Sequence, residues 1–489
     1  MSLVALESLI ACLKCLYQKG KSMSPELIKL FYLVAGLLFA VAIKMLSHPR
    51  TAVRGNLVGS LGMLIAVVVT LLDQRILSYE VIVAGIIVGS FIGIYLAFKP
   101  PMTDVPQVVA IFNGFGGAAS ALAVGAALEE LLSVGLVEDI TLQFSLAALF
   151  SCLVGGISFT GSGIAFLKLQ GLMRGSPILL PGRHVINALL LVACLYFSYD
   201  MILNPSTSTS FWIVFALSSL LGVLLVIPIG GADMPVVISL LNSYSGIAAA
   251  ADGWALNNSV LIIGGSLVGA AGFILTMLMS KAMNRSLPNI IFAAVGQEIA
   301  GSSEQSKYYE DKIKRASSDD VAMMLEGARK VIIVPGYGMA VAQAQFAISD
   351  LSRLLEKRGV EVSYAIHPVA GRMPGHMNVL LAEAKVEYDK LKDLDSINDE
   401  FSKADVALVI GANDTVNINA RKNDPSLPIS GMPILDVDKA TSVVIIKRSL
   451  SAGFASVPNP LFIGDNVLMY FGDAKEQVLK LIKTIKEIA

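Results

Sequence analysis

The C-terminal part of the chain contains a glycine-rich turn whose residue types suit a phosphorylated ligand. It follows the apolar segment 331–334, precedes a predicted helix, and consists of Gly336, Tyr337, Gly338, Met339, Ala340 and Val341. Glycines between a strand and a helix let the backbone approach a pyrophosphate at the N-terminus of the helix. This turn therefore predicts a dinucleotide-binding site.

A second group with chemical potential is formed by Lys447, Arg448 and Ser449, at the end of the apolar segment 442–446. Two cations and a hydroxyl suit a phosphomonoester, although a solvated strand end has the same composition. The segment 360–366 ends at His367 and not at an acid. An acid there would bind the ribose 2′-hydroxyl of NAD, so its absence favours NADP.

Two more loops follow predicted strands. One contains Val369, Ala370, Gly371, Arg372, Met373 and Pro374, and the other contains Gly411, Ala412, Asn413, Asp414 and Thr415. Loops at the carboxyl ends of parallel strands are where such sheets bind ligands. His367 and His376 have no cluster of carboxylates or cysteines beside them, so we predict neither a catalytic histidine nor a metal site.

The elements that must position these loops alternate between strand and helix patterns. We predict strands at 331–334, 360–366, 406–410, 433–437 and 442–446. Such alternation is typical of an α/β Rossmann-like domain with a parallel sheet. We place this domain at 329–489, after a linker or hinge at 281–328.

The preceding residues, 28–280, form a predicted transmembrane domain. The chain is 55% hydrophobic, and the charged residues are concentrated after residue 280. A spanning helix needs about 20 apolar residues. Nine segments qualify: 28–46, 57–73, 79–98, 105–128, 141–168, 184–200, 211–229, 234–252 and 258–280. Lys/Arg bias then puts the C-terminal domain in the cytoplasm or the mitochondrial matrix.

Other features carry little information. Residues 1–27 form an N-terminal extension of unknown role, and Cys12-x-x-Cys15 within it has no second pair of ligands. Cys152 and Cys194 read as buried small apolar residues. A net charge of −1 gives no reason to expect nucleic acid as a partner.

Four polar residues within the predicted spans are candidates for a proton or ion route: Asn113, Ser162, Asp233 and Asn242. Polar groups in hydrocarbon need partners and are often functional. Hydrogen bonding between helices is the alternative for Asn113 and Asn242, and Asp233 beside Pro235 could be a helix cap. None of the predicted spans carries a carboxylate or a histidine at mid-depth.

Several longer motifs in the chain resemble those of the β subunit of proton-translocating NAD(P) transhydrogenase. The resemblance runs from about residue 28 to the C-terminus. It rests on GGADMPVV at 230–237, LNSYSG at 241–246, PGYGMAVAQAQ at 335–345, HMNVLLAEAK at 376–385 and GANDTVN at 411–417.

The resemblance implies hydride transfer between NADH and NADP+, linked to inward proton movement and forming NADPH. This chain would bind NADP(H), and an α subunit would bring the NAD(H) domain. We expect a dimer of αβ pairs in lipid, in a bacterial inner membrane or, in a eukaryote, the mitochondrial inner membrane. The cofactors carry the redox chemistry, so the lack of an acid–base pair is expected.

The family's functional positions map onto this chain residue by residue. The turn at 336–341 and the loop at 369–374 would hold the pyrophosphate region, while 447–449 would take the 2′-phosphate. Asp414 is the family's candidate for linking cofactor binding to proton state. Further residues that would line the cofactor are Gly431, Met432, Gly453, Phe454, Asp473 and Ala474.

Two positions depart from the family's pattern. Many relatives have histidine where this chain has Asn113, and we expect a histidine of the α subunit to serve instead. Phe454 replaces a tyrosine that flanks the NADP site, which removes one hydroxyl.

Other classes of protein remain alternatives. A transporter or channel gated by a regulatory nucleotide-binding domain would have an ion filter, and none is evident. A membrane-anchored soluble reductase would need no polar groups in its spans.

Overall fold

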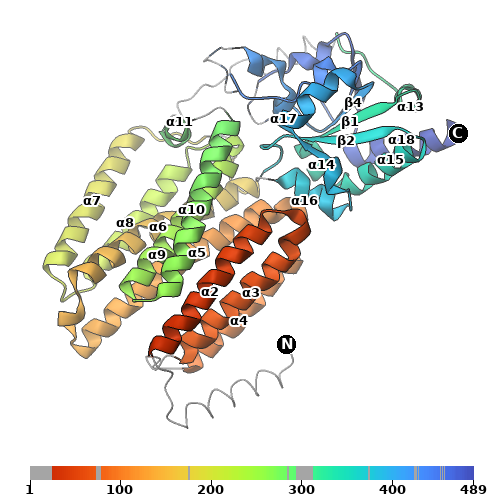
Figure 1. Ribbon diagram of the computed structural model, residues 1–489. Helices are drawn as coiled ribbons and strands as arrows, with labels where there is room; N and C mark the ends of the chain where they lie inside the picture. The colour runs from red at the N-terminus through yellow and green to blue at the C-terminus, as the bar shows by residue number, and fades with distance from the viewer. Residues whose placement is uncertain are drawn as a thin grey trace.

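The computed structural model describes residues 25–72, 79–174, 177–283, 286–292, 312–372, 375–422, 424, 427, 429–451, 453, 455 and 457–488. Most of the N-terminal extension and much of the linker lie outside these residues. So do three predicted cofactor residues: Met373, Pro374 and Phe454. Within the described part, a helical bundle is followed by a mixed α/β domain (Figure 1).

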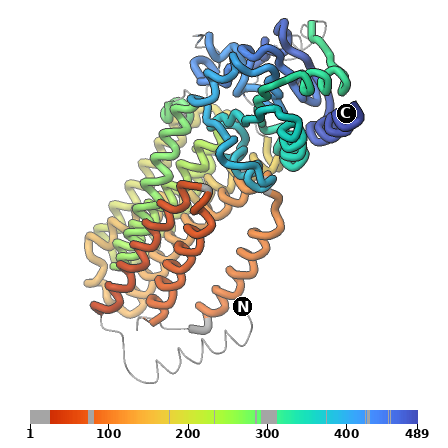
Figure 2. The backbone as a smooth tube through the Cα atoms, turned by 45° about the vertical axis from the view of Figure 1, so that its right-hand side comes forward, coloured from red at the N-terminus to blue at the C-terminus, as the bar shows by residue number. Residues whose placement is uncertain are grey.

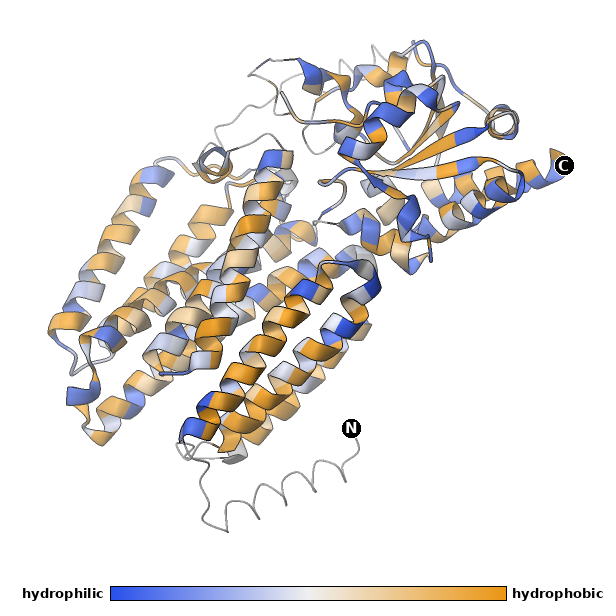
Figure 3. Ribbon diagram, in the orientation of Figure 1, coloured by the Kyte–Doolittle hydropathy of each residue, from blue (hydrophilic) through white to orange (hydrophobic). Residues whose placement is uncertain are grey.

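In the described part of the chain, nine helices are long and apolar enough to span a membrane. Each coincides with a predicted span, so that prediction is confirmed. They are α2 (Pro25–Leu46), α3 (Pro49–Leu72), α4 (Tyr79–Phe98), α5 (Val105–Val134), α6 (Leu142–Leu169), α7 (Arg183–Leu203), α8 (Thr209–Val226), α9 (Met234–Ala255) and α10 (Ser259–Ala282). Figure 3 shows that the residues of these helices are predominantly apolar, whereas apolar and polar residues are mixed in the α/β domain.

Helices α5, α6 and α9 are the most deeply buried spans, and small residues allow their backbones to meet. A Cβ on Gly117 of α5 would lie 2.6 Å from the carbonyl oxygen of Gly155 in α6. A Cβ on Gly246 of α9 would lie 2.5 Å from the amide nitrogen of Gly269 in α10. These glycines therefore serve close helix packing. By contrast, α4 has exposed side chains along its length and stands at the edge of the bundle in Figure 2.

The α/β domain is built on a parallel sheet of six strands in the order β3-β2-β1-β4-β5-β6. The strands are β1 (Lys330–Pro335), β2 (Glu361–Ile366), β3 (Leu391–Asp393), β4 (Val406–Ile410), β5 (Ser442–Lys447) and β6 (Val467–Phe471). This is the strand order of dinucleotide-binding Rossmann domains, and the order reverses between β1 and β4.

Both faces of the sheet are covered, which explains why its strands are continuously apolar. On β1, Val331 and Ile333 face a core that includes α13 (Ser318–Glu326), α15 (Gln345–Lys357), α16 (His376–Glu383) and α18 (Ala474–Ile488). Ile332 and Val334 face the opposite core, which includes the short helices η5 (Asn398–Lys403), η8 (Val437–Lys439) and η9 (Pro460–Ile463).

The predicted strand at 433–437 is wrong. This segment is irregular and leads into η8, because Pro433 has no N–H and its neighbours bond to loops: Leu435 N donates to Thr415 O at 3.0 Å. The sequence reading also missed β3 and β6. β3 has three residues with no apolar alternation, and β6 pairs at the sheet edge with β5.

Candidate functional site

The loops that follow β1 and β4 lie side by side at the carboxyl edge of the sheet. Gly336 N donates to Ile410 O at 2.9 Å, and Gly338 N donates to Gly411 O at 2.9 Å. The short helix α14 (Tyr337–Val341) begins here, with Met339 and Ala340 buried and Val341 exposed. The predicted turn therefore sits where the strand order reverses, the usual ligand position in such sheets.

Glycine is required at this contact because the two backbones nearly touch. A Cβ on Gly336 would lie 2.3 Å from both N and Cα of Ala412, and one on Gly338 would lie 2.7 Å from Cα of Gly411. Gly411 itself has φ of +66°, a conformation that side chains disfavour. The two loops therefore pack backbone against backbone at the carboxyl edge of the sheet, where domains of this kind bind a pyrophosphate.

The loop after β2 is braced by two histidines. His367 Nδ1 accepts from Val369 N at 3.2 Å, so its Nε2 donates to Pro433 O at 2.7 Å. His376 Nδ1 accepts from Arg372 N at 3.0 Å. Burial lowers the pKa of both imidazoles to about 4, and Arg372 adds to this at His376. Both histidines are therefore neutral supports for the loop that contains Ala370 and Gly371.

Arg372 lies at the mouth of the glycine turn. Its guanidinium stands 4.6 Å from the ring centroid of Tyr337. Its Nε is buried and has no hydrogen-bond acceptor among the described residues. Since a buried guanidinium N–H is costly without an acceptor, this atom points to an anionic ligand.

A second cluster gathers at the ends of β4 and β5. Lys447 Nζ donates to Ser451 O at 2.5 Å, and Ser449 Oγ lies 2.7 Å from Ser451 Oγ. Asn413 Nδ2 also donates to Ser451 O, at 3.2 Å. Burial lowers the pKa of Lys447 to about 8, although the nearby negative charge of Asp414 acts to raise it. Arg448 and Ser449 are exposed, as a binding site for a phosphate from solvent requires.

Asp414 joins this cluster to the loop beyond β5. Its Oδ2 accepts from Ala455 N at 3.1 Å, and a Cβ on Gly453 would lie 2.3 Å from its Oδ1. Asp414 therefore contacts the backbone of a predicted cofactor loop directly.

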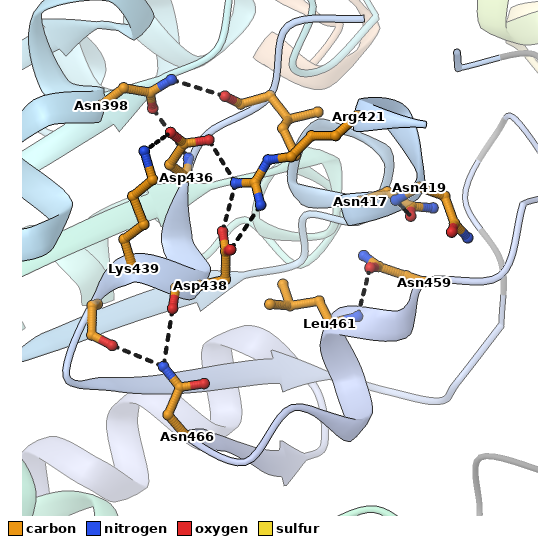
Figure 4. Close-up of polar contacts among 12 residues, drawn as sticks. Asn398, Asn417, Asn419, Arg421, Asp436, Asp438, Lys439, Asn459, Leu461 and Asn466 are labelled. Atoms are coloured by element: carbon orange, nitrogen blue, oxygen red, sulfur yellow. Dashed lines mark hydrogen bonds and ion pairs between the residues drawn. The ribbon is translucent and has the colours of Figure 1, made fainter. Parts of the chain in front are cut away.

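Gly431 and Met432 lie in a long loop held by ion pairs. Met432 packs in a small apolar cluster together with Val369, which places it beside the loop after β2. Arg421 bridges Asp436 and Asp438 at 2.6 and 2.7 Å, and Lys439 pairs with Asp436 at 2.6 Å (Figure 4). This network fixes the loop from both ends.

Asp473 and Ala474 follow β6, the neighbour of β5. Asp473 Oδ1 accepts from Lys475 N at 3.0 Å, so the carboxylate caps the start of α18. Ala474 is buried in the core. Because Gly472 N donates to Lys447 O at 3.0 Å, this turn lies against the strand end that carries the predicted phosphate site.

In the bundle, the predicted polar residues lie on or beside three helices that pack together, α5, α6 and α9. Asn113 of α5 is 7% exposed and its Nδ2 donates to Ile238 O at 3.3 Å. Ser162 of α6 is fully buried, and its Oγ has no partner among the described residues. Asp233, directly before the first residue of α9, is buried, and Asn242 of α9 is half-buried. The interhelical bond expected as the alternative for Asn113 is therefore present.

The buried polar residues of the bundle that the sequence did not single out as site candidates include Gln107, Lys168 and Asp252. In the sequence, Lys168 is a cation at the end of one predicted span and Asp252 lies at the end of another, where charged residues are usually solvated. Asp252 is 4% exposed, and its Oδ1 meets no donor in the part of the chain that the structure describes. The one sequence signal that could have indicated these buried charges is a charged residue at the end of an apolar run. Among the described residues, no group of three His, Cys, Asp or Glu side chains could hold a metal ion.

A multi-span bundle joined to a dinucleotide-type Rossmann domain defines a membrane protein that handles a nucleotide cofactor. A family model described as NAD(P) transhydrogenase beta subunit matches residues 28–484. NAD(P) transhydrogenase subunit beta of Rhodospirillum rubrum is 48% identical over 456 residues, or 93% of this chain and 98% of that protein. The protein from a particular strain of that bacterium matches with the same figures. The chain belongs to the NAD(P) transhydrogenase beta subunit family.

Proposed function

We propose that this chain binds NADP(H) and, with an α subunit that carries NAD(H), catalyses Re/Si-specific hydride transfer from NADH to NADP+. The transfer is coupled to inward proton movement. Bound NADP+ supplies the nicotinamide that accepts the hydride. The working assembly is a dimer of αβ pairs in a bacterial or mitochondrial inner membrane, with the α/β domain in the cytoplasm or matrix.

The observation that carries this proposal is the close backbone contact of Gly336 and Gly338 with Gly411 and Ala412, at the point where the strand order reverses. Beside it, Arg372 presents a buried Nε that needs an acceptor. These groups suit the pyrophosphate, and Lys447, Arg448 and Ser449 suit the 2′-phosphate. These groups fit a dinucleotide with a 2′-phosphate, which NADP has and NAD lacks.

The other residues of the site shape the cofactor's surroundings. Gly431 and Met432 border the site from the loop that Arg421 holds, and Gly453 brings the chain against Asp414. Asp473 and Ala474 close the edge beside β5. We assign to Asp414 the link between cofactor binding and proton state.

The proton route in this chain runs along α5, α6 and α9. Asn113, Ser162 and Asn242 would orient water or a proton, and Asp233 would gate the end nearest the α/β domain. Asp252 supplies a carboxylate at the opposite end of α9. A histidine of the α subunit completes the route where this chain has Asn113. A proton that crosses a membrane potential contributes about 2.3 kcal/mol per 100 mV, enough to drive a nearly thermoneutral exchange towards NADPH.

The proposal is tested by co-expression with an α subunit and reconstitution into sealed vesicles. We expect reduction of an NADP+ analogue by NADH to respond to an uncoupler. A complex that transfers hydride at the same rate with and without the uncoupler would contradict the coupling. A chain that binds NAD+ as tightly as NADP+ would contradict the cofactor assignment. For the histidine, an α subunit without one in its spans would refute that part.

A further inference from the structure

Arg372, which lies in a predicted cofactor loop, also contacts the membrane domain. Its Nη1 donates to the carbonyl oxygen of Leu169 at 2.8 Å, and Leu169 is the last residue of α6. Gln107 lies in the first turn of α5, and its side-chain amide is buried. In one of its two orientations, this amide forms a hydrogen bond with each of its two neighbours. Its oxygen then accepts from Arg372 Nη1 at 3.3 Å and its nitrogen donates to Asp104 O at 3.1 Å. One guanidinium therefore joins the ends of two spans.

These two spans carry two of the predicted proton-route residues. Asn113 stands six residues after Gln107 on α5, and Ser162 stands seven residues before Leu169 on α6. At 1.5 Å per residue, they lie about 9 and 10 Å along the helices from the contact with Arg372. If either helix end shifts as a rigid body, the shift therefore also moves Asn113 or Ser162.

Lys168, the neighbour of Leu169, extends this connection to the third helix of the route. The side chain is 5% exposed. Its Nζ donates to Ile227 O at 2.6 Å and to Ile229 O at 2.7 Å. Within the described residues, no carboxylate lies within ion-pair distance of it. A buried ammonium whose acceptors are carbonyl oxygens restrains the positions of those carbonyls strongly, because no other acceptor is near enough to take their place.

The carbonyls that Lys168 holds lie just before the start of α9. Gly230 and Gly231 follow Ile229, and Asp233 N donates to Gly230 O at 3.1 Å. Asp233 is buried, and α9 begins at the next residue. The position of Lys168 therefore determines the position of the loop that carries Asp233.

We infer that Lys168 is a positioning residue that couples the nucleotide domain to Asp233. Arg372 holds the end of α6 through Leu169, and Lys168 on the same helical turn holds the loop before α9. A change in the hydrogen bond between Arg372 and Leu169 therefore moves this turn of α6. Through Lys168, the movement is passed to the loop that contains Asp233. This inference rests on the proposed function, since it assigns a route to the coupling proposed there.

The cofactor would join this connection through the buried Nε of the guanidinium. Nη1 is engaged with the membrane domain, while Nε has no acceptor in the described chain. A phosphate oxygen on Nε would place the cofactor and the end of α6 on the same side chain. Loss of Arg372 should therefore weaken cofactor binding as well as coupling, whereas loss of Lys168 should affect coupling alone.

The test uses the reconstituted αβ complex with Lys168→Met, which keeps most of the side-chain volume without the donors. Three quantities are measured: the Kd for NADP+ by equilibrium titration, hydride transfer without a gradient, and its acceleration by an imposed proton gradient. We expect the first two to stay within about twofold and the acceleration to fall about tenfold or more, as for loss of charged hydrogen bonds. Arg372→Met should in addition weaken NADP+ binding about tenfold.

Two variants serve as controls for this test. Lys44→Met removes an exposed lysine from the last turn of α2 and should leave all three quantities unchanged. Lys168→Arg keeps donors for both carbonyls and should restore most of the acceleration. A merely structural role would instead lower hydride transfer and NADP+ binding along with the acceleration.

The inference is overturned if the proton gradient accelerates hydride transfer by Lys168→Met as much as by the wild type, or if all three quantities fall together. Should that variant not assemble, Gln107→Leu removes the other side-chain contact of Arg372 with the membrane domain. It should lower the acceleration about threefold with NADP+ binding unchanged, and an unaltered acceleration would contradict the inference. If the wild-type complex itself shows no acceleration, the proposed function fails, and that result is distinct from failure of this inference.

Discussion

The amide nitrogen of Gly338 donates a 2.9 Å hydrogen bond to the carbonyl oxygen of Gly411, which ties the loop after β1 to the loop after β4. No side chain takes part in this contact. The shape of the candidate cofactor site therefore depends on backbone packing, and a single added carbon atom should be enough to disturb it.

Gly336→Ala should weaken NADP+ binding by about tenfold or more, since a clash at this depth typically costs about 1–3 kcal/mol. The new Cβ would lie 2.3 Å from backbone atoms of Ala412. Gly327→Ala is the matched control, because its Cβ would meet nothing nearer than Met323 O at 3.6 Å. Equilibrium titration of both variants provides the comparison, and equal affinities would show that the packing of these two loops does not shape the cofactor site.

NADP+ affinity should fall as the pH rises through the pKa of Lys447, which burial lowers to about 8. The ammonium is charged below this value and neutral above it, so its attraction for the 2′-phosphate is present at pH 7 and lost at high pH. If the charged form alone binds, Kd rises about tenfold between pH 7 and pH 9. Lys447→Arg should flatten the profile, because arginine keeps its charge. A flat profile for the wild type would exclude Lys447 from the phosphate site.

Asn113→Leu should reduce proton movement per hydride about tenfold while leaving NADP+ affinity unchanged, because loss of a buried hydrogen bond and its polar group costs about 1–3 kcal/mol. Asn113 Nδ2 donates to Ile238 O in α9 at 3.3 Å. Ser151→Ala removes a comparable bond from α6 to Ala248 O in α9, 3.0 Å long, and should have little effect on proton movement. Equal losses in both variants would mean that Asn113 acts through helix packing alone.

Asp252→Asn should lower gradient-driven NADPH formation about tenfold if its carboxylate carries the proton at the far end of α9. Hydride transfer without a gradient should persist. Asp200→Asn changes a carboxylate near the end of α7 that already accepts from Asn204 and Ser210, and should leave the gradient response intact. Retention of the full response by Asp252→Asn would remove this residue from the proton route.

The spans and the central strands could be predicted because each depends on local composition. About 20 apolar residues in succession specify a spanning helix, and the apolar run before Gly336 specifies β1. The segment 433–437 misled because Leu435 and Val437 are buried against one face of the sheet without being part of it, and because Pro433 cannot donate to a sheet. β3 was invisible because three largely polar residues carry no periodic signal.

The connection between the two halves could not be predicted, because it depends on contacts between residues far apart in the chain. Lys168 reads in sequence as one of several cations that flank spans, and its burial becomes evident once Ile227 and Ile229 lie beside it. Arg372 was predicted from a loop as a cofactor ligand. Its second bond, to Leu169, is set by how the α/β domain rests on the bundle.

The most direct test of the account is the proton movement that accompanies each hydride transferred. The complex would be sealed in vesicles with a pH-sensitive dye outside and inside, and NADH and NADP+ supplied on the side of the α/β domain. The account predicts that protons move towards that side as NADPH forms, and that an uncoupler abolishes the pH change while hydride transfer continues. Formation of NADPH with no pH change in tightly sealed vesicles would contradict it.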